Sequence, residues 1–270
     1  MVRSLARAQA AAGHLFLRVL WFLTAVQHPR FVVKSVHRLA RVLLPPQMKI
    51  WAQVRKGPAE GLWIRLNLRT GKDLFDGTRE TLVQEALTSH LGPGMVLYDV
   101  GANIGLFTMI GARCVGKLGK VFAFEPDPEL CQRLKDNVLR NGFSNVEIVQ
   151  AAVCSTTGSI DFVRANIEDS PDLGLGRIGA PLPGQSAIRV RSVALDDFAQ
   201  EVALPDVVKC DVEGAELAVL EGARSLLNRQ KPILVCETHA TGGLEQVRQL
   251  LVQTGYTLRW IDGNHLLASH

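Results

Sequence analysis

The chain of 270 residues lacks the cysteine patterns of a zinc site or a disulfide framework. Its five cysteines are odd in number and widely spaced, and no two of them form a C-x-x-C pair. Several lie within expected strands or helices, which favours buried free thiols in a reducing, cytoplasmic compartment. The length allows one large α/β domain with an appendage, and 47% hydrophobic and 21% charged residues are ordinary for a globular protein.

Acidic residues are absent from the first 59 positions, which contain ten Lys and Arg residues; Glu60 is the first acid. The remainder has 20 basic and 26 acidic residues, a formal charge of −6. We therefore expect no nucleic-acid partner for that part of the chain, because a nucleic-acid surface needs an excess of positive charge.

The N-terminal segment, residues 1–46, also lacks an apolar run long enough to span a bilayer. Its most apolar stretch, 15–26 (LFLRVLWFLTAV), is a dozen residues long and contains Arg18, with no clear signal-cleavage site. Residues 30–43 combine helical periodicity with a basic face and end before Pro45 and Pro46. Three interpretations stay open: a helical arm on an anionic membrane surface, an arm packed on protein, and an organellar transit peptide.

A dinucleotide fingerprint of the form G-x-G-x-x-G is also missing. The stretch 96–105 (VLYDVGANIG) instead has an apolar run ending in Asp99, then a turn with Gly101, Asn103 and Gly105, then a helix-compatible stretch. This pattern predicts a buried parallel strand, a tight turn and a helix, the opening unit of a nucleotide-binding sheet. The two glycines permit a sharp bend and the close approach of a ligand without phosphates, such as S-adenosylmethionine.

A second acid follows about two dozen residues later. The stretch 120–126 (KVFAFEP) predicts the second strand, which ends in Glu125. An acid at this position commonly holds the two hydroxyls of a ribose. The turn and the acid together favour a nucleoside-containing cofactor, whereas the turn alone is equally compatible with a structural corner.

Strands and helices alternate along the rest of the chain. Residues 47–92 form a preface in which 48–70 predicts a pair of strands and 81–90 a helix. In the main domain, residues 93–270, further strands are expected at 146–153, 158–165, 188–193, 206–211, 232–237, 257–261 and 266–269, and helices at 104–115, 128–141, 215–228 and 245–255. The alternation predicts a doubly wound, mostly parallel sheet, and the last two strands add an antiparallel edge across Asp262-Gly263-Asn264. The irregular stretch 166–186 is interpreted either as a substrate lid or as a surface insertion.

A second group of polar residues follows two of these strands. Asp211 and Glu213 end one strand, and Glu237 and His239 end the next. Alternate residues share a face, so three carboxylates and an imidazole are expected to meet beside the first glycine turn. They are candidates for catalysis by deprotonation of a hydroxyl, with His239 the natural base; a divalent metal is possible but not favoured. Glu216 is interpreted as a residue of the first helical turn.

These motifs together resemble the FkbM family of S-adenosylmethionine-dependent methyltransferases. The resemblance rests on 99–105 (DVGANIG), 124–126 (FEP), 195–198 (LDDF), 209–216 (KCDVEGAE) and 77–80 (GTRE), and covers about residues 75–240. It implies a class I, Rossmann-like methyltransferase fold with a seven-stranded sheet and methylation of a hydroxyl on a sugar or a secondary metabolite. The basic segment 1–46, which is not part of the shared motifs, adds a glycolipid as a candidate acceptor. By position, Asp99, Gly101 and Asn103 would border the methionine part of the cofactor, Glu125 the ribose, and Ala151 and Ala152 the adenine, with Gly105 and Asp211 completing the site.

Two other functions compete with this one. A nicotinamide-dependent oxidoreductase could use the same turn and Glu125, but the missing fingerprint counts against it. A non-catalytic membrane-surface protein with a decayed cofactor fold would explain the basic segment 1–46, but the intact acids at positions 99, 125 and 211 count against decay. Direct in-line transfer of a methyl group to a small-molecule or glycolipid acceptor is the favoured reaction, with contact between residues 1–46 and a membrane left open.

Overall fold

The computed structural model describes residues 49–67, 70–164, 176–182, 185–239 and 243–270. The expected arm at 1–46 lies outside these residues. The chain divides into two compact units: the described residues of the first end at Arg79, and the second begins at Glu80. In the part of the chain that the structure describes, no helix is long and apolar enough to cross a membrane.

The described part of the first unit is the expected strand pair followed by a short helix. Strand β1 (Lys49–Gln53) pairs antiparallel with β2 (Trp63–Asn67), in a register that sets Ile50 opposite Leu66. Alternate apolar side chains of both strands are buried, as period-two patterning requires. Helix α3 (Lys72–Asp76), with five residues, was not predicted, since it is too short to show a helical period.

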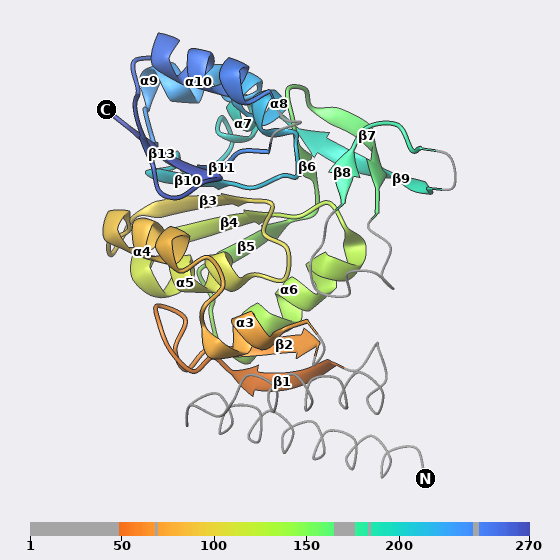
Figure 1. Cartoon of the computed structure of the whole chain (residues 1–270), viewed down its shortest axis with the longest axis vertical. Helices are drawn as coiled ribbons and strands as arrows, with labels where there is room; N and C mark the ends of the chain where they lie inside the picture. Colours follow the sequence, from red (N-terminus) through yellow and green to blue (C-terminus); the bar gives the residue numbers. More distant parts are fainter. Residues whose placement is uncertain (1–48, 68–69, 165–175, 183–184, 240–242) are drawn as a thin grey trace. The chain divides into compact units, whose positions relative to one another are not determined.

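A seven-stranded sheet forms the centre of the second unit (Figure 1). Its order is β12-β13-β11-β10-β3-β4-β5, with β3 (Val96–Val100), β4 (Lys120–Phe124), β5 (Val146–Val149), β10 (Val207–Cys210), β11 (Ile233–Glu237), β12 (Thr257–Trp260) and β13 (His265–Ser269). The five strands β5, β4, β3, β10 and β11, in that order across the sheet, are parallel to one another, and β13 is antiparallel to both of its neighbours. The predicted mostly parallel α/β sheet is confirmed, with one refinement: β13 inserts between β11 and β12, so the outer strand is β12.

Helices cover both faces of this sheet. Figure 1 shows α4 (Thr81–His90), α5 (Leu106–Val115) and α6 (Pro128–Arg140) on one face, and α8 (Glu216–Glu221), α9 (Arg224–Arg229) and α10 (Leu244–Gln253) on the other. Central strands buried on both faces need nearly continuous apolar sequence, and all four residues of β10 are buried. The prediction of a single helix at 215–228 is wrong. The helix is interrupted between α8 and α9, where the Gly222 carbonyl accepts a hydrogen bond from the Asp196 amide at 2.8 Å.

A second, four-stranded sheet is inserted between β5 and β10. Its order is β6-β9-β7-β8, with β6 (Ala152–Val153), β7 (Gly158–Val163), β8 (Arg177–Ile178) and β9 (Ala187–Val193). The strand expected at 146–153 is therefore two strands in different sheets. The stretch 166–186, expected to be irregular throughout, contains β8, whose two residues pair with β7; residues 165–175 and 183–184 lie outside the described chain.

Four aromatic rings pack edge to face under the central sheet. Tyr98, Phe122 and Phe124 come from β3 and β4, and Phe198 comes from α7 (Leu195–Phe198). Their centroids lie 4.9–5.7 Å apart, and the Tyr98 hydroxyl donates a hydrogen bond to the Ala203 carbonyl at 2.8 Å. Burial of so much aromatic surface anchors the segment before β10 to the strands that carry the first turn.

We expect Asp196→Ala to destabilise the second unit by about 1–2 kcal/mol, because Asp196 caps the start of α9. Its carboxylate accepts hydrogen bonds from the amides of Ser225 and Leu226, both at 2.8 Å. The matched control is the neighbouring exposed acid Asp197, which contacts Thr157 on the surface; we expect Asp197→Ala to change stability by less than about 0.5 kcal/mol. Urea unfolding of both variants measures the difference, and equal losses would contradict the capping role.

Candidate functional site

A cleft of about 560 Å³ opens at the carboxyl ends of β3, β4 and β10, the edge where parallel α/β sheets bind ligands. One wall comes from the turn after β3 and the residues after β4, and another from the loop after β10. The second sheet contributes a third wall. The lining residues are Gly101, Asn103, Phe124, Glu125, Pro126, Ala151, Ala152, Val153, Phe162, Gly176, Ile178, Asp211, Val212, Glu213 and Ala215.

The turn after β3 has the close backbone approach that its glycines predict. Gly101 has φ 78°, and a Cβ atom there would lie 1.7 Å from the Asp211 carbonyl oxygen, so only glycine fits. Asn103 also adopts a left-handed conformation, with φ 52°, and its side-chain oxygen accepts the Ile104 amide at 2.7 Å. Gly105 has φ 92° and packs against Leu134, away from the cleft lining. The two glycines therefore have different structural roles: Gly101 lets the loops after β3 and β10 pack closely, and Gly105 lets the turn pack against α6.

Glu125 is held at the floor of the cleft. Its side chain is buried, and its two carboxylate oxygens accept the backbone amides of Asn103 and Asp127, each at 2.9 Å. Burial raises the pKa of Glu125 to about 7, although both amide hydrogen bonds lower it. The carboxylate thus joins the turn after β3 to the start of α6 and lines the cavity where the sequence predicted a ligand's diol.

A buried lysine lies behind the cleft, between two acids of the predicted site. The Lys209 ammonium is 2.9 Å from Asp211 Oδ2 and 3.9 Å from Asp99 Oδ1, and it lies 4.9 Å from the centre of the Phe107 ring. Burial alone would lower the pKa of Lys209, but the carboxylates of Asp211 and Asp99 outweigh this and raise it. Sequence reasoning assigned this residue no role, although a lysine inside an otherwise apolar buried strand is the signal that would have found it.

Asp99 lies beneath the cleft and not along its lining. Its side chain is fully buried, and Oδ2 accepts a hydrogen bond from the Thr108 hydroxyl at 2.5 Å. Burial raises the pKa of Asp99, against the opposing effect of Lys209. Its predicted contact with a cofactor stays a prediction, whereas Gly101, Asn103, Glu125, Ala151, Ala152 and Asp211 do line one cavity.

The four predicted catalytic side chains come together at the ends of β10 and β11. Burial opposes ionisation of Asp211, but Lys209 and a hydrogen bond with Glu237 hold its pKa below the usual range. The pKa of Glu237 is raised to about 9 by burial and by that same contact with Asp211. The two acids therefore share one proton near neutral pH, carried by Glu237 and donated to Asp211.

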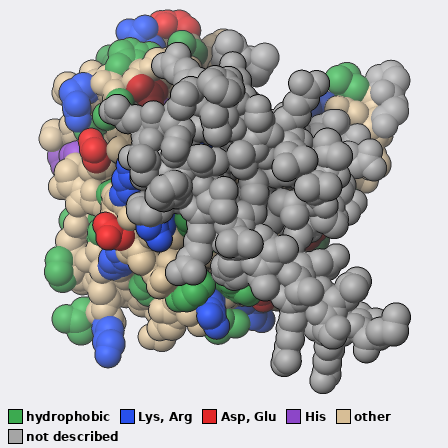
Figure 2. Space-filling model, turned by 60° about the horizontal axis from the view of Figure 1, so that its bottom comes forward, with side chains coloured by type: hydrophobic (Ala, Val, Ile, Leu, Met, Phe, Trp, Pro, Cys, Tyr) green, Lys and Arg blue, Asp and Glu red, His purple; other side chains and the backbone are tan. Residues whose placement is uncertain are grey.

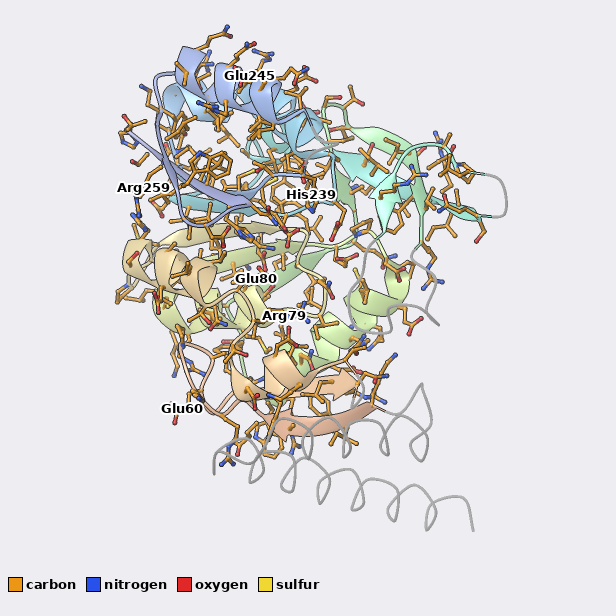
Figure 3. The ribbon with its side chains drawn as sticks, viewed as in Figure 1. Glu60, Arg79, Glu80, His239, Glu245 and Arg259 are labelled. Atoms are coloured by element: carbon orange, nitrogen blue, oxygen red, sulfur yellow. The ribbon has the colours of Figure 1, made fainter. Side chains whose placement is uncertain are left out.

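His239 and Glu213 lie on the other side of this pair of acids. His239 follows β11 (Figure 3), and its Nε2 atom is 3.3 Å from Glu213 Oε2 and 3.7 Å from Glu237 Oε1. Its Nδ1 atom is 2.8 Å from Glu216 Oε1. Burial raises the pKa of Glu213, and the Asp211 carboxylate adds to the effect. The predicted convergence is therefore present, with Glu216 as an additional member.

A second histidine that sequence reasoning missed, His265 at the start of β13, faces the same acids. Its Nδ1 atom lies 2.9 Å from Asp262, and its Nε2 atom lies 3.8 Å from both Glu80 and Glu237. Glu80 begins α4 and is labelled in Figure 3. Only the antiparallel pairing of β11 with β13, in which Glu237 is opposite His265, brings these residues together. Among the described residues, no group of three or more His, Cys, Asp and Glu side chains is arranged to hold a metal ion.

We expect the free energy of unfolding of the wild type, compared with that of the Glu125→Gln variant, to fall as the pH rises from about 4.5 to about 7. The pKa of Glu125 is raised in the folded state, so its contribution is fully present below 4.5 and is lost as the carboxyl ionises near 7. The difference should reach order 1–3 kcal/mol in urea unfolding measured across this pH range. Glu147→Gln, at an exposed acid paired with Lys120, is the control for replacing a carboxylate with an amide in the second unit. A wild type and Glu125→Gln pair with parallel profiles would contradict the raised pKa.

Comparison with known proteins identifies the family. The sequence profile of the methyltransferase FkbM domain matches residues 99–258. The hexuronic acid methyltransferase AglP of Haloferax volcanii is 32% identical over 194 residues, which cover 71% of this chain and 72% of that protein. The 2-O-methyltransferase NoeI of Sinorhizobium fredii is 28% identical over 190 residues, covering 64% and 76%.

Among solved structures, the methyltransferase FkbM of Methylobacillus flagellatus matches with a TM-score of 0.48 and 19% identity, over 75% of this chain and 54% of that one. The profile match spans more than half of this chain and includes the glycine turn, Glu125, Asp211 and His239. The chain therefore belongs to the FkbM family of methyltransferases.

Proposed function

We propose that this protein transfers the methyl group of S-adenosylmethionine to a hydroxyl of a sugar or glycolipid. Family membership implies S-adenosylmethionine as the methyl donor. The observation that carries the proposal is one cavity whose lining includes the Glu125 carboxylate together with Asp211 and Glu213. Such a cavity offers a single ligand both a hydrogen-bond acceptor for a diol and a set of proton-binding groups. The family also favours methyl transfer over the nicotinamide-dependent alternative.

The residues present fit this cofactor. Gly101 lines the cavity and lets the loop after β10 pack against the first turn, and the Glu125 carboxylate is fixed by two amides before any ligand arrives. Ala151, between β5 and β6, and Ala152, the first residue of β6, offer small side chains for a flat base. When bound, the cofactor supplies a methyl carbon: its bond to the acceptor oxygen forms while its bond to sulfur breaks, the electron pair stays on sulfur, and the hydroxyl proton leaves to a base.

A neutral hydroxyl suits the other end of the cavity better than a carboxylate acceptor does. Asp211, Glu213, Glu216 and Glu237 gather there, and Lys209 is already paired with two acids. An additional negative charge on the acceptor would be repelled in this partly buried setting. The names of the relatives, one a hexuronic acid methyltransferase and one a 2-O-methyltransferase, support a sugar acceptor, and the charge of the site favours one of its hydroxyls.

The basic segment 1–46 supports an acceptor presented at a membrane, such as a glycolipid. Figure 2 shows one face of the molecule, on which the described Lys and Arg side chains are interspersed with Asp and Glu. The first 59 residues hold ten Lys and Arg residues and no acid, whereas the remainder has a formal charge of −6, so the basic excess belongs to the N-terminal residues. Polybasic segments gain about 1 kcal/mol for each Lys or Arg near an anionic lipid surface. Peripheral contact of a cytoplasmic enzyme with the membrane is therefore part of the proposal.

We expect the wild type to bind S-adenosylmethionine in calorimetry and Glu125→Ala to bind it about 100-fold more weakly or worse, because two hydrogen bonds to a charged group are lost. Glu147→Ala should bind normally, and titration with reduced nicotinamide cofactor should give no signal. Repeating the titration with a divalent metal and with a chelator tests a metal requirement. The wild type with bound cofactor should then methylate neutral methyl glycosides faster than glycuronates. No cofactor binding by a folded wild type would refute the proposed function.

We expect full-length protein to bind vesicles containing phosphatidylserine, with a loss of about 100-fold or more when Arg30, Lys34, Arg38 and Arg41 are all changed to Gln. The control changes the same number of exposed basic residues in the second unit: Lys117, Arg191, Arg224 and Arg248. Sedimentation with vesicles at low and high salt measures both variants. Equal binding by the two variants would contradict a membrane role for residues 1–46, and cofactor binding should be the same in both.

A further inference from the structure

Glu216 holds the imidazole of His239 through an oxygen that also accepts a backbone amide. The side chain of Glu216 is 1% exposed, and its Oε1 atom accepts the Gly214 amide at 3.0 Å while lying 2.8 Å from His239 Nδ1. An ionised carboxylate can only accept hydrogen bonds, so the Nδ1 atom donates to Glu216 Oε1. The neutral imidazole therefore carries its hydrogen on Nδ1, which leaves the lone pair on Nε2.

The Nε2 atom lies beside an acid of the cleft lining, although His239 is not itself part of that lining. Its neighbour Glu213, at 3.3 Å, lines the cavity, and the His239 side chain is 25% exposed. Glu213 has φ 53°, a left-handed conformation that costs a non-glycine residue about 1 kcal/mol. With this backbone conformation, the Glu213 carboxylate lies beside His239 Nε2, and Glu216, three residues later, contacts His239 Nδ1.

Two acids of the site, Asp211 and Glu237, are less suited to remove a proton. Asp211 is held by the Lys209 ammonium at 2.9 Å, which keeps its pKa low and makes it a weak base. Glu237 keeps its own proton near neutral pH because its pKa is raised to about 9. The charged groups that face His239 are Asp211 and Glu213 from the loop after β10, Glu216 from α8 and Glu237 from β11.

We propose that His239 Nε2 takes the proton of the acceptor hydroxyl, and that Glu216 is the positioning residue that fixes the tautomer needed for this step. The proposal rests on the proposed methyl transfer to a hydroxyl. The proton moves from the acceptor oxygen to the Nε2 lone pair as the new oxygen–carbon bond forms. The resulting imidazolium lies between the carboxylates of Glu216 and Glu213, which stabilise its charge.

The tautomer can be measured without any acceptor. Long-range ¹H–¹⁵N spectra of the full-length protein at a pH where the imidazole is neutral should show His239 with its hydrogen on Nδ1, and His239→Gln assigns the signal. Glu216→Met keeps the side-chain volume but removes the acceptor, so it should lose this tautomer. Glu216→Gln keeps an oxygen for both hydrogen bonds and should restore it, whereas Glu213→Gln should leave it unchanged.

A hydrogen on Nε2 in the wild type, or an unchanged tautomer in Glu216→Met, would overturn the positioning role. These outcomes do not depend on the proposed function, which fails instead if the wild type binds no S-adenosylmethionine or methylates no glycoside.

Steady-state kinetics test the proposed role of His239 as the base. With the methyl glycoside used above, His239→Gln and Glu216→Met should lower kcat about 100-fold or more, with the KM for S-adenosylmethionine little changed. The kcat of Glu216→Gln should lie between those of these variants and that of the wild type, because this variant keeps the tautomer of His239 and loses the negative charge of Glu216. The exposed acid Glu245 on α10 (Figure 3) provides the control, since Glu245→Gln should retain full activity. A kcat in Glu216→Met or His239→Gln within about threefold of the wild type would overturn the proposal.

Discussion

The pairing of the Lys209 ammonium with Asp99 and Asp211 is the interaction on which this site depends. A buried ammonium or carboxylate is very costly unless it has a partner of opposite charge, and here one cation serves two anions. Asp99 and Lys209 are opposite each other in the register of β3 and β10, so the pairing fixes the alignment of the two strands that carry both functional loops. Gly101 completes the arrangement, since its lack of a Cβ allows the Asp211 carbonyl to approach its backbone.

This ion pair also separates the acids of the site into different chemical roles. Asp211 is kept ionised by Lys209, and the nearby Glu237 keeps a proton as a result. Glu125, which is farther along the cleft and fixed by two amides, has a pKa raised by burial to about 7. Acids with the same chemistry thus differ in protonation because their surroundings differ, which is how one cleft can offer both hydrogen-bond acceptors and proton-binding groups.

Much of this arrangement could be predicted from the sequence, since it follows from local signals. The turn with Gly101 and Gly105, the acid after β4, and the polar residues after β10 and β11 all lie at strand ends, which parallel sheets bring to one edge. Lys209 and His265 were missed for different physical reasons. The first is a charge inside an apolar strand whose partners are distant in sequence, and the second reaches the site only because β13 inserts next to β11. The tertiary contact that recruits Glu216 to His239 likewise leaves no local pattern, because an acid in the first turn of a helix is common for other reasons.

We infer that one cleft holds the nucleoside part of the methyl donor against Glu125 and presents its reactive end to Asp211 and Glu213, beside His239. A crystal structure of the full-length protein with S-adenosylhomocysteine tests this arrangement. We expect the ribose hydroxyls to lie within hydrogen-bond distance of the Glu125 carboxylate and the sulfur to face the residues after β10. A product bound elsewhere, or bound in this cleft with its ribose away from Glu125, would contradict it.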